Sequence, residues 1–217
     1  MNRRLLRPMP VPKVSIGMPV WNGEPFLADA IRSLQRQTFR DYELIVYDNS
    51  SSDRTRHIVQ AAARHDRRIH YVLHRKNIGA IANFNGALAG AHAPFFMWAA
   101  HDDLWEPDFV GETYRLLQSA PEAVLSFTCL DMINARAYPT ESNYILGKYT
   151  VGGDAFARYR RFLDAPQLSG IACLVYGMMR TSHARRAGAF KTGKYGTWGS
   201  DLLFLLRLLS RGRFLVS

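Results

Sequence analysis

The feature that most constrains the fold is a regular alternation of short apolar runs with amphipathic stretches, which extends from Val14 to Cys129. The apolar runs contain many β-branched and aromatic residues and predict strands at residues 14–20, 42–47, 69–73, 94–99 and 124–129. Between the runs, apolar side chains recur at helical spacing, beginning after Pro25. Four such alternations specify βαβ units, and therefore an α/β fold with a mostly parallel central sheet flanked by helices.

The second half of the chain has a different pattern. Residues 131–153 are rich in Asn, Tyr, Gly and Pro without a clear period, and predict a long functional loop. Asp154 can cap a basic amphipathic helix, and residues 174–180 predict one more strand. Residues 191–199 predict a mobile lid before a helix over Asp201–Leu209.

Composition excludes several classes of protein. Hydrophobic residues at 47% and charged residues at 21% are typical of globular chains, and no apolar run is long enough to span a membrane. The two cysteines, Cys129 and Cys173, are too few for a disulfide scaffold or a Cys-based zinc site, which favours a cytoplasmic location. Residues 1–12, with three prolines and three arginines, predict a basic arm outside the fold.

The net charge indicates an anionic partner. Lys and Arg number 28 against 18 Asp and Glu, which gives a formal charge of +10. Nucleic acid, an anionic membrane surface and a phosphate-rich small molecule would all satisfy this charge. Charge alone does not choose between them.

Several familiar phosphate and hydrolase motifs are missing from the sequence. The turn after the first predicted strand, Trp21–Pro25, has neither a Gly-rich dinucleotide fingerprint nor a Walker lysine loop. No Gly-x-Ser-x-Gly elbow occurs in the chain. These observations disfavour a dinucleotide-dependent enzyme, a P-loop NTPase and an α/β-hydrolase.

Carboxylates instead follow the predicted strands. Asp48 ends one apolar strand, and Asp102 and Asp103 follow another, at the sheet edge where ligands of parallel sheets bind. Adjacent aspartates repel one another unless a cation or a hydrogen-bond donor compensates, and a divalent cation bridging to a diphosphate would do so. Alternatively, the two aspartates only cap the turn before the helix that begins at Pro107. From these residues alone both interpretations stand.

A set of short motifs occurs in order along the chain, in the segments Val14–Gly23, Gln37–Phe39, Glu43–Thr55, Asn77–Gly79 and Ala100–Trp105. Together these segments resemble family 2 glycosyltransferases. The likeness continues to about Phe214 and implies a single GT-A domain over residues 13–217. Within it, residues 13–105 would be the nucleotide-binding half and residues 106–217 the acceptor-binding half. Many members of that family continue further, so the resemblance leaves open that the acceptor half is truncated.

The resemblance also implies a nucleotide site at the strand ends. The residues that would border the nucleotide are Pro19, Val20, Trp21, Asp48, Arg75, Asn77 and Asp102. Asp48 would accept a hydrogen bond from a base N–H, and Asp103 would bind a divalent metal, Mn²⁺ or Mg²⁺. The family's usual pattern at the metal is Asp-x-Asp-Asp, whereas this chain has Ala100 at the first position, which leaves the exact metal shell open.

A late aspartate is the implied catalytic base. The segment Gly199–Arg207 is similar to the family's Glu-Asp element before a helix, with Ser200 in place of the glutamate and Asp201 as the base. The alternative is that Asp201 is the N-cap of that helix. Both roles are compatible, because a helix N-terminus favours an ionised carboxylate.

The implied activity is inverting transfer of a sugar from a nucleotide-diphosphate sugar to an acceptor hydroxyl, in cell-surface polysaccharide or glycolipid synthesis. A UDP-sugar is the favoured donor, with dTDP and GDP open, and a saccharide or lipid-linked acceptor would place the protein at the inner face of the membrane. A nucleotidyltransferase is an alternative, but it would carry a Gly-rich loop with Lys or Arg after the first strand. A basic nucleic-acid-binding module would need Lys and Arg clustered with exposed aromatics, so no nucleic-acid partner is expected.

Overall fold

The computed structural model describes residues 11–144, 153–164, 171–188, 190–191 and 199–216. Most of the basic arm predicted at residues 1–12 and most of the lid predicted at residues 191–199 lie outside these ranges. Within the described ranges, no helix combines the length and the apolar content that crossing a bilayer requires.

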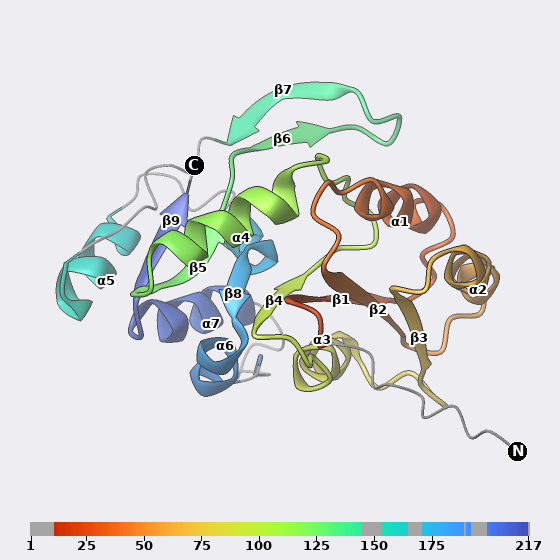
Figure 1. The fold of residues 1–217 in the computed structure, drawn as a ribbon, viewed down its shortest axis with the longest axis horizontal. Helices are drawn as coiled ribbons and strands as arrows, with labels where there is room; N and C mark the ends of the chain where they lie inside the picture. The colour runs from red at the N-terminus through yellow and green to blue at the C-terminus, as the bar shows by residue number, and fades with distance from the viewer. Residues whose placement is uncertain (1–10, 145–152, 165–170, 189, 192–198, 217) are drawn as a thin grey trace, which may run out of the picture.

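The first half of the chain confirms the predicted alternation of strands and helices (Figure 1). Its elements are β1 Val14–Val20, α1 Leu27–Gln35, β2 Tyr42–Asp48, α2 Thr55–His65, β3 Ile69–Leu73, α3 Ala80–Ala89, β4 Phe95–Trp98, α4 Phe109–Ser119 and β5 Ala123–Phe127. Every residue of β1 is buried, as expected for a strand covered on both faces by helices. Helix α1 buries Leu27, Ala30, Ile31 and Leu34, the residues whose spacing predicts it.

The prediction of a long loop at residues 131–153 is wrong for the first part of that segment. The strands β6 Leu130–Ile133 and β7 Pro139–Tyr144 form an antiparallel hairpin, and residues 145–152 lie outside the described ranges. The turn of the hairpin is held by the side chain of Asn134, whose Oδ1 accepts from the N–H of Arg136 at 2.9 Å and of Tyr138 at 3.2 Å. Side-chain hydrogen bonds of this kind leave no hydrophobic period in the sequence, which is why the pattern predicted a loop.

The strand predicted at residues 174–180 is only partly correct. A 3₁₀-helix, η2 Ile171–Tyr176, takes up its first part, and β8 is confined to Met178–Arg180. Between them the chain passes so close to β5 that a Cβ on Gly177 would lie 2.7 Å from the carbonyl oxygen of Ser126. Tertiary packing against β5 therefore keeps the residues before Met178 out of strand β8, although residues 174–176 are apolar and β-prone.

Three helices and a last strand complete the chain: α5 Ala155–Leu163, α6 Thr181–Ala187, α7 Ser200–Leu209 and β9 Arg213–Val216. The predicted cap of α5 is confirmed, because Asp154 Oδ1 accepts from the N–H of Ala157 at 2.8 Å. The strand β9 was not predicted from the sequence.

The seven-stranded sheet has the order β3-β2-β1-β4-β8-β5-β9. The pairs β1–β2, β2–β3, β1–β4 and β5–β9 are parallel, and only β8 runs antiparallel, between β4 and β5. From β1 the chain passes to β2 on one side, while β4 pairs on the other side of β1. Ligands of open α/β sheets bind at such a reversal, at the carboxyl ends of the strands beside it. Here these strands are β1 and β4, and we refer to this edge of the sheet as the crevice.

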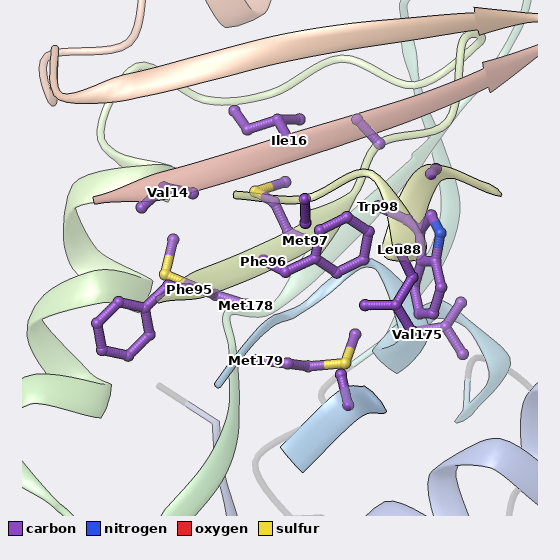
Figure 2. Packing of buried hydrophobic residues seen from close by; sticks show 14 of the residues in the cluster. Val14, Ile16, Leu88, Phe95, Phe96, Met97, Trp98, Val175, Met178 and Met179 are labelled. Atoms are coloured by element: carbon purple, nitrogen blue, oxygen red, sulfur yellow. The ribbon is translucent and has the colours of Figure 1, made fainter. Parts of the chain in front are cut away.

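The hydrophobic core is continuous across β4 and β8, as the close view shows (Figure 2). At its centre the indole ring of Trp98 stacks on Phe190 with ring centroids 4.8 Å apart, and meets Phe96 and Phe204 edge-on. The indole N–H donates to the carbonyl of Phe84 at 2.9 Å. One side chain thus connects β4, α3 and α7 and holds α7 against the sheet.

Candidate active site

Two strand-end loops are joined to form one wall of the crevice. Three backbone N–H groups after β1 donate to side chains after β2, each at 2.9 Å: Asn22 to Ser51, Gly23 to Thr55 and Glu24 to Asp53. These bonds hold the backbone that directly follows Trp21, whose side chain is 55% exposed. The predicted aromatic face is therefore on the surface of this edge, available to stack on a flat ligand.

Asp48 is fully buried beneath this wall. Its Oδ1 accepts from the N–H of Ser51 at 2.9 Å, and its Oδ2 accepts from the hydroxyl of Tyr71 at 2.6 Å. Burial, followed by that hydrogen bond and the negative charge of Asp48, raises the pKa of Tyr71. Pro19 and Val20 lie in the neighbouring strand β1 and are also buried, and Val20 pairs directly with Asp48 of β2. A contact between Asp48 and a nucleobase stays a prediction, since a base would reach it only after neighbouring atoms move.

Asn77 and Arg75 lie on the connection after β3 and differ in their contacts. Asn77 Oδ1 accepts from Asn49 Nδ2 at 3.0 Å and from the N–H of Gly79 at 2.8 Å, so this side chain shapes the loop. Arg75 is exposed and makes no hydrogen bond or ion pair with any residue that the structure describes. Its guanidinium is therefore free to receive an anion.

The loop after β4 meets the loop after β1. A Cβ on Gly23 would lie 2.6 Å from Val20 Cγ2 and 3.0 Å from His101 Cδ2, so only glycine permits this approach. The contact places Asp102 and Asp103, the next two residues after His101, at the same edge as Trp21. Both aspartates are exposed, and neither accepts a hydrogen bond from the described part of the chain.

The electrostatics of this pair fit a cation. Although the Asp103 side chain is in contact with solvent, the surrounding protein partly desolvates its carboxyl group. This desolvation, and then the negative charge of Asp102, raise the pKa of Asp103 above its usual range, and His101 opposes the shift. Among the described residues, no group of three or more His, Cys, Asp or Glu side chains could hold a metal by itself. Two exposed carboxylates without donors nonetheless match the way in which Mg²⁺ is commonly bound, through one or two carboxylates plus substrate phosphates.

Asp201 lies in the first turn of α7 and is half-buried. The N-cap of α7 is Gly199, so the alternative prediction that Asp201 is the N-cap is wrong. The carboxylate Oδ1 instead accepts from the N–H of Leu202 at 2.8 Å, and the second oxygen accepts no hydrogen bond from a described residue.

Tyr176 connects the two groups of carboxylates and was not predicted from the sequence. It ends η2, which packs against both α7 and β4. Burial raises the pKa of Tyr176 most, and the negative charges of Asp103, Asp102 and Asp201 raise it further. Asp103 and Asp201 likewise add to the burial that raises the pKa of the Cys173 thiol. The strand predicted over residues 174–180 concealed Tyr176, because it placed this residue within the sheet and not at a helix end.

The comparison with known protein families gives a match to glycosyl transferase family 2 over residues 15–182. A GalNAc(5)-diNAcBac-PP-undecaprenol beta-1,3-glucosyltransferase of Campylobacter jejuni is 38% identical over 94 residues, or 43% of this chain and 30% of that protein. The putative teichuronic acid biosynthesis glycosyltransferase TuaG of Bacillus subtilis is 34% identical over 97 residues, or 45% of this chain and 38% of that protein. The matched regions thus span about a third of these curated relatives.

Solved structures with low sequence identity share the fold. TarS of S. aureus, residues 1–349, superposes with a TM-score of 0.72 at 18% identity, covering 94% of this chain and 58% of that one. The mannosyltransferase PcManGT of Pyrobaculum calidifontis, solved with GDP-Man and Mn²⁺, gives a TM-score of 0.67 at 16% identity over 95% and 55% of the two chains. The family match covers most of the described sheet and includes every strand end of the crevice. The chain therefore belongs to glycosyl transferase family 2, and its sheet and helices form the GT-A fold.

Proposed function

We propose that the protein transfers a sugar, with inversion, from a nucleotide-diphosphate sugar to an acceptor hydroxyl in the synthesis of a cell-surface polysaccharide or glycolipid. The observation that carries the proposal is that η2 packs against both β4 and α7, and that the negative charges of Asp103, Asp102 and Asp201 all raise the pKa of Tyr176 at its end. Carboxylates from the loop after β4 and from the start of α7 are therefore near the same residue. Donor phosphates and an acceptor hydroxyl can then be held side by side there.

In the proposed reaction, the Asp201 carboxylate takes the proton of the acceptor hydroxyl while the acceptor oxygen attacks the anomeric carbon. Attack comes from the face opposite the leaving diphosphate, so the new glycosidic bond forms as the sugar–phosphate bond breaks. The nucleoside diphosphate departs with the electron pair of that bond. The second carboxylate oxygen of Asp201, which accepts no hydrogen bond from a described residue, suits this role.

Asp102 and Asp103 are the residues that would hold a divalent cation, Mn²⁺ or Mg²⁺, together with the donor phosphates. Such a cation would supply electrostatic stabilisation of the departing diphosphate. The exposed guanidinium of Arg75 is available to the same phosphates from the β3 side. The Mn²⁺ and GDP-Man bound by the structural relative PcManGT support this assignment.

The nucleotide would lie over residues 13–105, stacked on Trp21, and the acceptor against residues 106–217. UDP is the favoured nucleotide, because the fold relative TarS was solved with UDP and with UDP-GlcNAc. A lipid-linked saccharide is a candidate acceptor, since the Campylobacter relative is named as acting on an undecaprenol-linked substrate.

Calorimetry with UDP, dTDP and GDP in the presence of Mn²⁺ tests the donor site. We expect one of the three to bind with a dissociation constant between roughly 1 μM and 1 mM, or about −4 to −8 kcal/mol. The Trp21→Ala variant should bind more weakly, since base stacking on an aromatic ring is lost. Absence of binding by all three nucleotides would contradict the proposed donor site.

Asp103→Asn should weaken UDP binding in Mn²⁺ by about tenfold, because one charged cation ligand is lost. Binding of free uridine, which carries no phosphate, should not change. Asp108→Asn is the matched control, because Asp108 is an exposed residue of the same connection that makes no capping hydrogen bond. Equal losses of UDP and uridine binding in Asp103→Asn would show that Asp103 supports the fold instead.

A further inference from the structure

A cavity of about 450 Å³ lies away from the strand-end crevice and has several basic residues in its lining. Its titratable lining residues are Glu122, Arg158, His183, Arg211 and Arg213, and we refer to this cavity as the basic pocket. These residues come from the connection before β5, from α5, from α6, from the turn between α7 and β9 and from the start of β9. The volume is within the range of ordinary small-ligand sites.

The basic pocket is at the edge of the sheet opposite the crevice. Arg213 begins β9 and pairs with Ala123, which begins β5, so the pocket borders the amino ends of these parallel strands. The crevice lies at the carboxyl ends of β1 and β4. In Figure 1 the elements around the basic pocket, α5, α6, α7 and β9, are grouped on the side of the molecule away from α1, α2 and β3. A donor nucleotide bound in the crevice would not occupy this pocket.

Positive charge in the basic pocket is only partly neutralised. Arg213 forms an ion pair with Glu122, the single carboxylate among its described lining residues. Arg158 donates to main-chain carbonyls, from Nε to Leu209 at 2.9 Å and from Nη2 to Ser210 at 3.3 Å. These bonds fix the guanidinium at the end of α7 without cancelling its charge.

Arg211 also has no carboxylate partner in the described part of the chain. It donates from Nη2 to the carbonyl of Arg186, and its remaining N–H groups make no hydrogen bond with a described residue. Arg213 Nε is buried and makes no hydrogen bond with a described residue. Burial, and then the positive charges of Arg186, Arg180 and Arg211, lower the pKa of His183. An anion in the pocket would offset the repulsion among these positive charges.

We propose that the basic pocket binds a phosphate group, carried by a soluble phosphate ester or by an anionic lipid headgroup. Guanidinium groups from α5 and from the connection between α7 and β9 line this pocket together. Several guanidinium donors suit the several oxygens of a tetrahedral phosphate better than the two oxygens of a carboxylate. The site is independent of sugar transfer and does not require that the proposed function be correct.

Calorimetric titration of the whole protein with inorganic phosphate is the first test. Wild type should bind phosphate, and Arg211→Gln should weaken binding by about tenfold, the effect of losing one charged hydrogen bond. His183→Gln is a second variant on another element, for the case in which Arg211→Gln does not fold. A melting curve for each variant establishes that it is folded.

Arg67→Gln is the matched control. Arg67 is exposed, precedes β3 at the other end of the sheet, and makes no hydrogen bond or ion pair with a described residue. The control removes the same charge and should leave phosphate binding unchanged. Asp103→Asn should also leave it unchanged, which separates the basic pocket from the proposed donor site.

Vesicles identify the source of the phosphate. Vesicles of phosphatidylcholine with phosphatidic acid that retain wild type but not Arg211→Gln would support a lipid headgroup, with pure phosphatidylcholine as the blank. Phosphate binding without vesicle binding would support a soluble ester. The proposal is overturned if phosphate does not bind, or if Arg67→Gln weakens binding as much as Arg211→Gln does.

Discussion

Replacing Asp201 by Asn is expected to reduce sugar transfer by roughly 10²–10⁴-fold, the usual effect of losing a general base. The amide keeps a side-chain oxygen that can accept from the N–H of Leu202, so the first turn of α7 should remain intact. The basic carboxylate is lost, and the acceptor hydroxyl then has no group to receive its proton. The measurement pairs the rate of transfer to a competent acceptor with the melting temperature of the variant.

Asp154→Asn is the control for this experiment. Asp154 caps α5, outside the proposed crevice, and Asn is also a good N-cap, so both stability and transfer should be close to wild type. Nucleotide binding should be unchanged in Asp201→Asn, because Asp201 is assigned to the acceptor. An Asp201→Asn protein that melts normally and transfers sugar at the wild-type rate would remove Asp201 from the mechanism.

Replacing Trp98 by Ala should lower the free energy of unfolding by about 3–5 kcal/mol. The indole is fully buried and contacts four phenylalanine rings, and its N–H satisfies the carbonyl of Phe84. Removing it leaves a large cavity and an unpaired buried carbonyl at the junction of β4, α3 and α7. Urea denaturation monitored by far-UV circular dichroism measures the change.

Phe156→Ala is the matched aromatic control. Phe156 on α5 is 77% exposed, so its loss should change the free energy of unfolding by no more than about 0.5 kcal/mol. If both variants lost similar stability, or if Trp98→Ala were as stable as wild type, the central position given to Trp98 in the core would be wrong.

The nucleotide-binding half was predictable because its signals are local. In β1 and α1, each strand is a short buried run and each helix carries its own apolar stripe, so pattern and burial agree residue by residue. A mostly parallel sheet follows from those elements, because strands joined by helices are connected by crossovers and then pair in parallel. The same local patterns are sufficient to place Asp48, Asp102 and Asp103 at the ends of strands.

Elsewhere the determining contacts are distant along the chain or leave no periodic pattern in it. The hairpin β6–β7 depends on hydrogen bonds between the side chain of Asn134 and the backbone of its turn, and the start of β8 depends on how closely Gly177 packs on β5. Neither effect produces a hydrophobic period. The sequence therefore predicted a loop for the first and a longer strand for the second.

By itself, the sequence determined the α/β class, the strand-end carboxylates and the likeness to family 2 glycosyltransferases, because periodicity and short motifs are properties of neighbouring residues. Only the tertiary structure decided which of these residues meet. It packed η2 against α7 and β4, so that the negative charges of Asp103 and Asp201, almost a hundred residues apart in the sequence, both raise the pKa of Tyr176. It also gathered arginines from α5, from the turn after α7 and from the start of β9 into the basic pocket. Such groupings depend on long-range strand pairing and packing, in which distance along the chain has no bearing on distance in space.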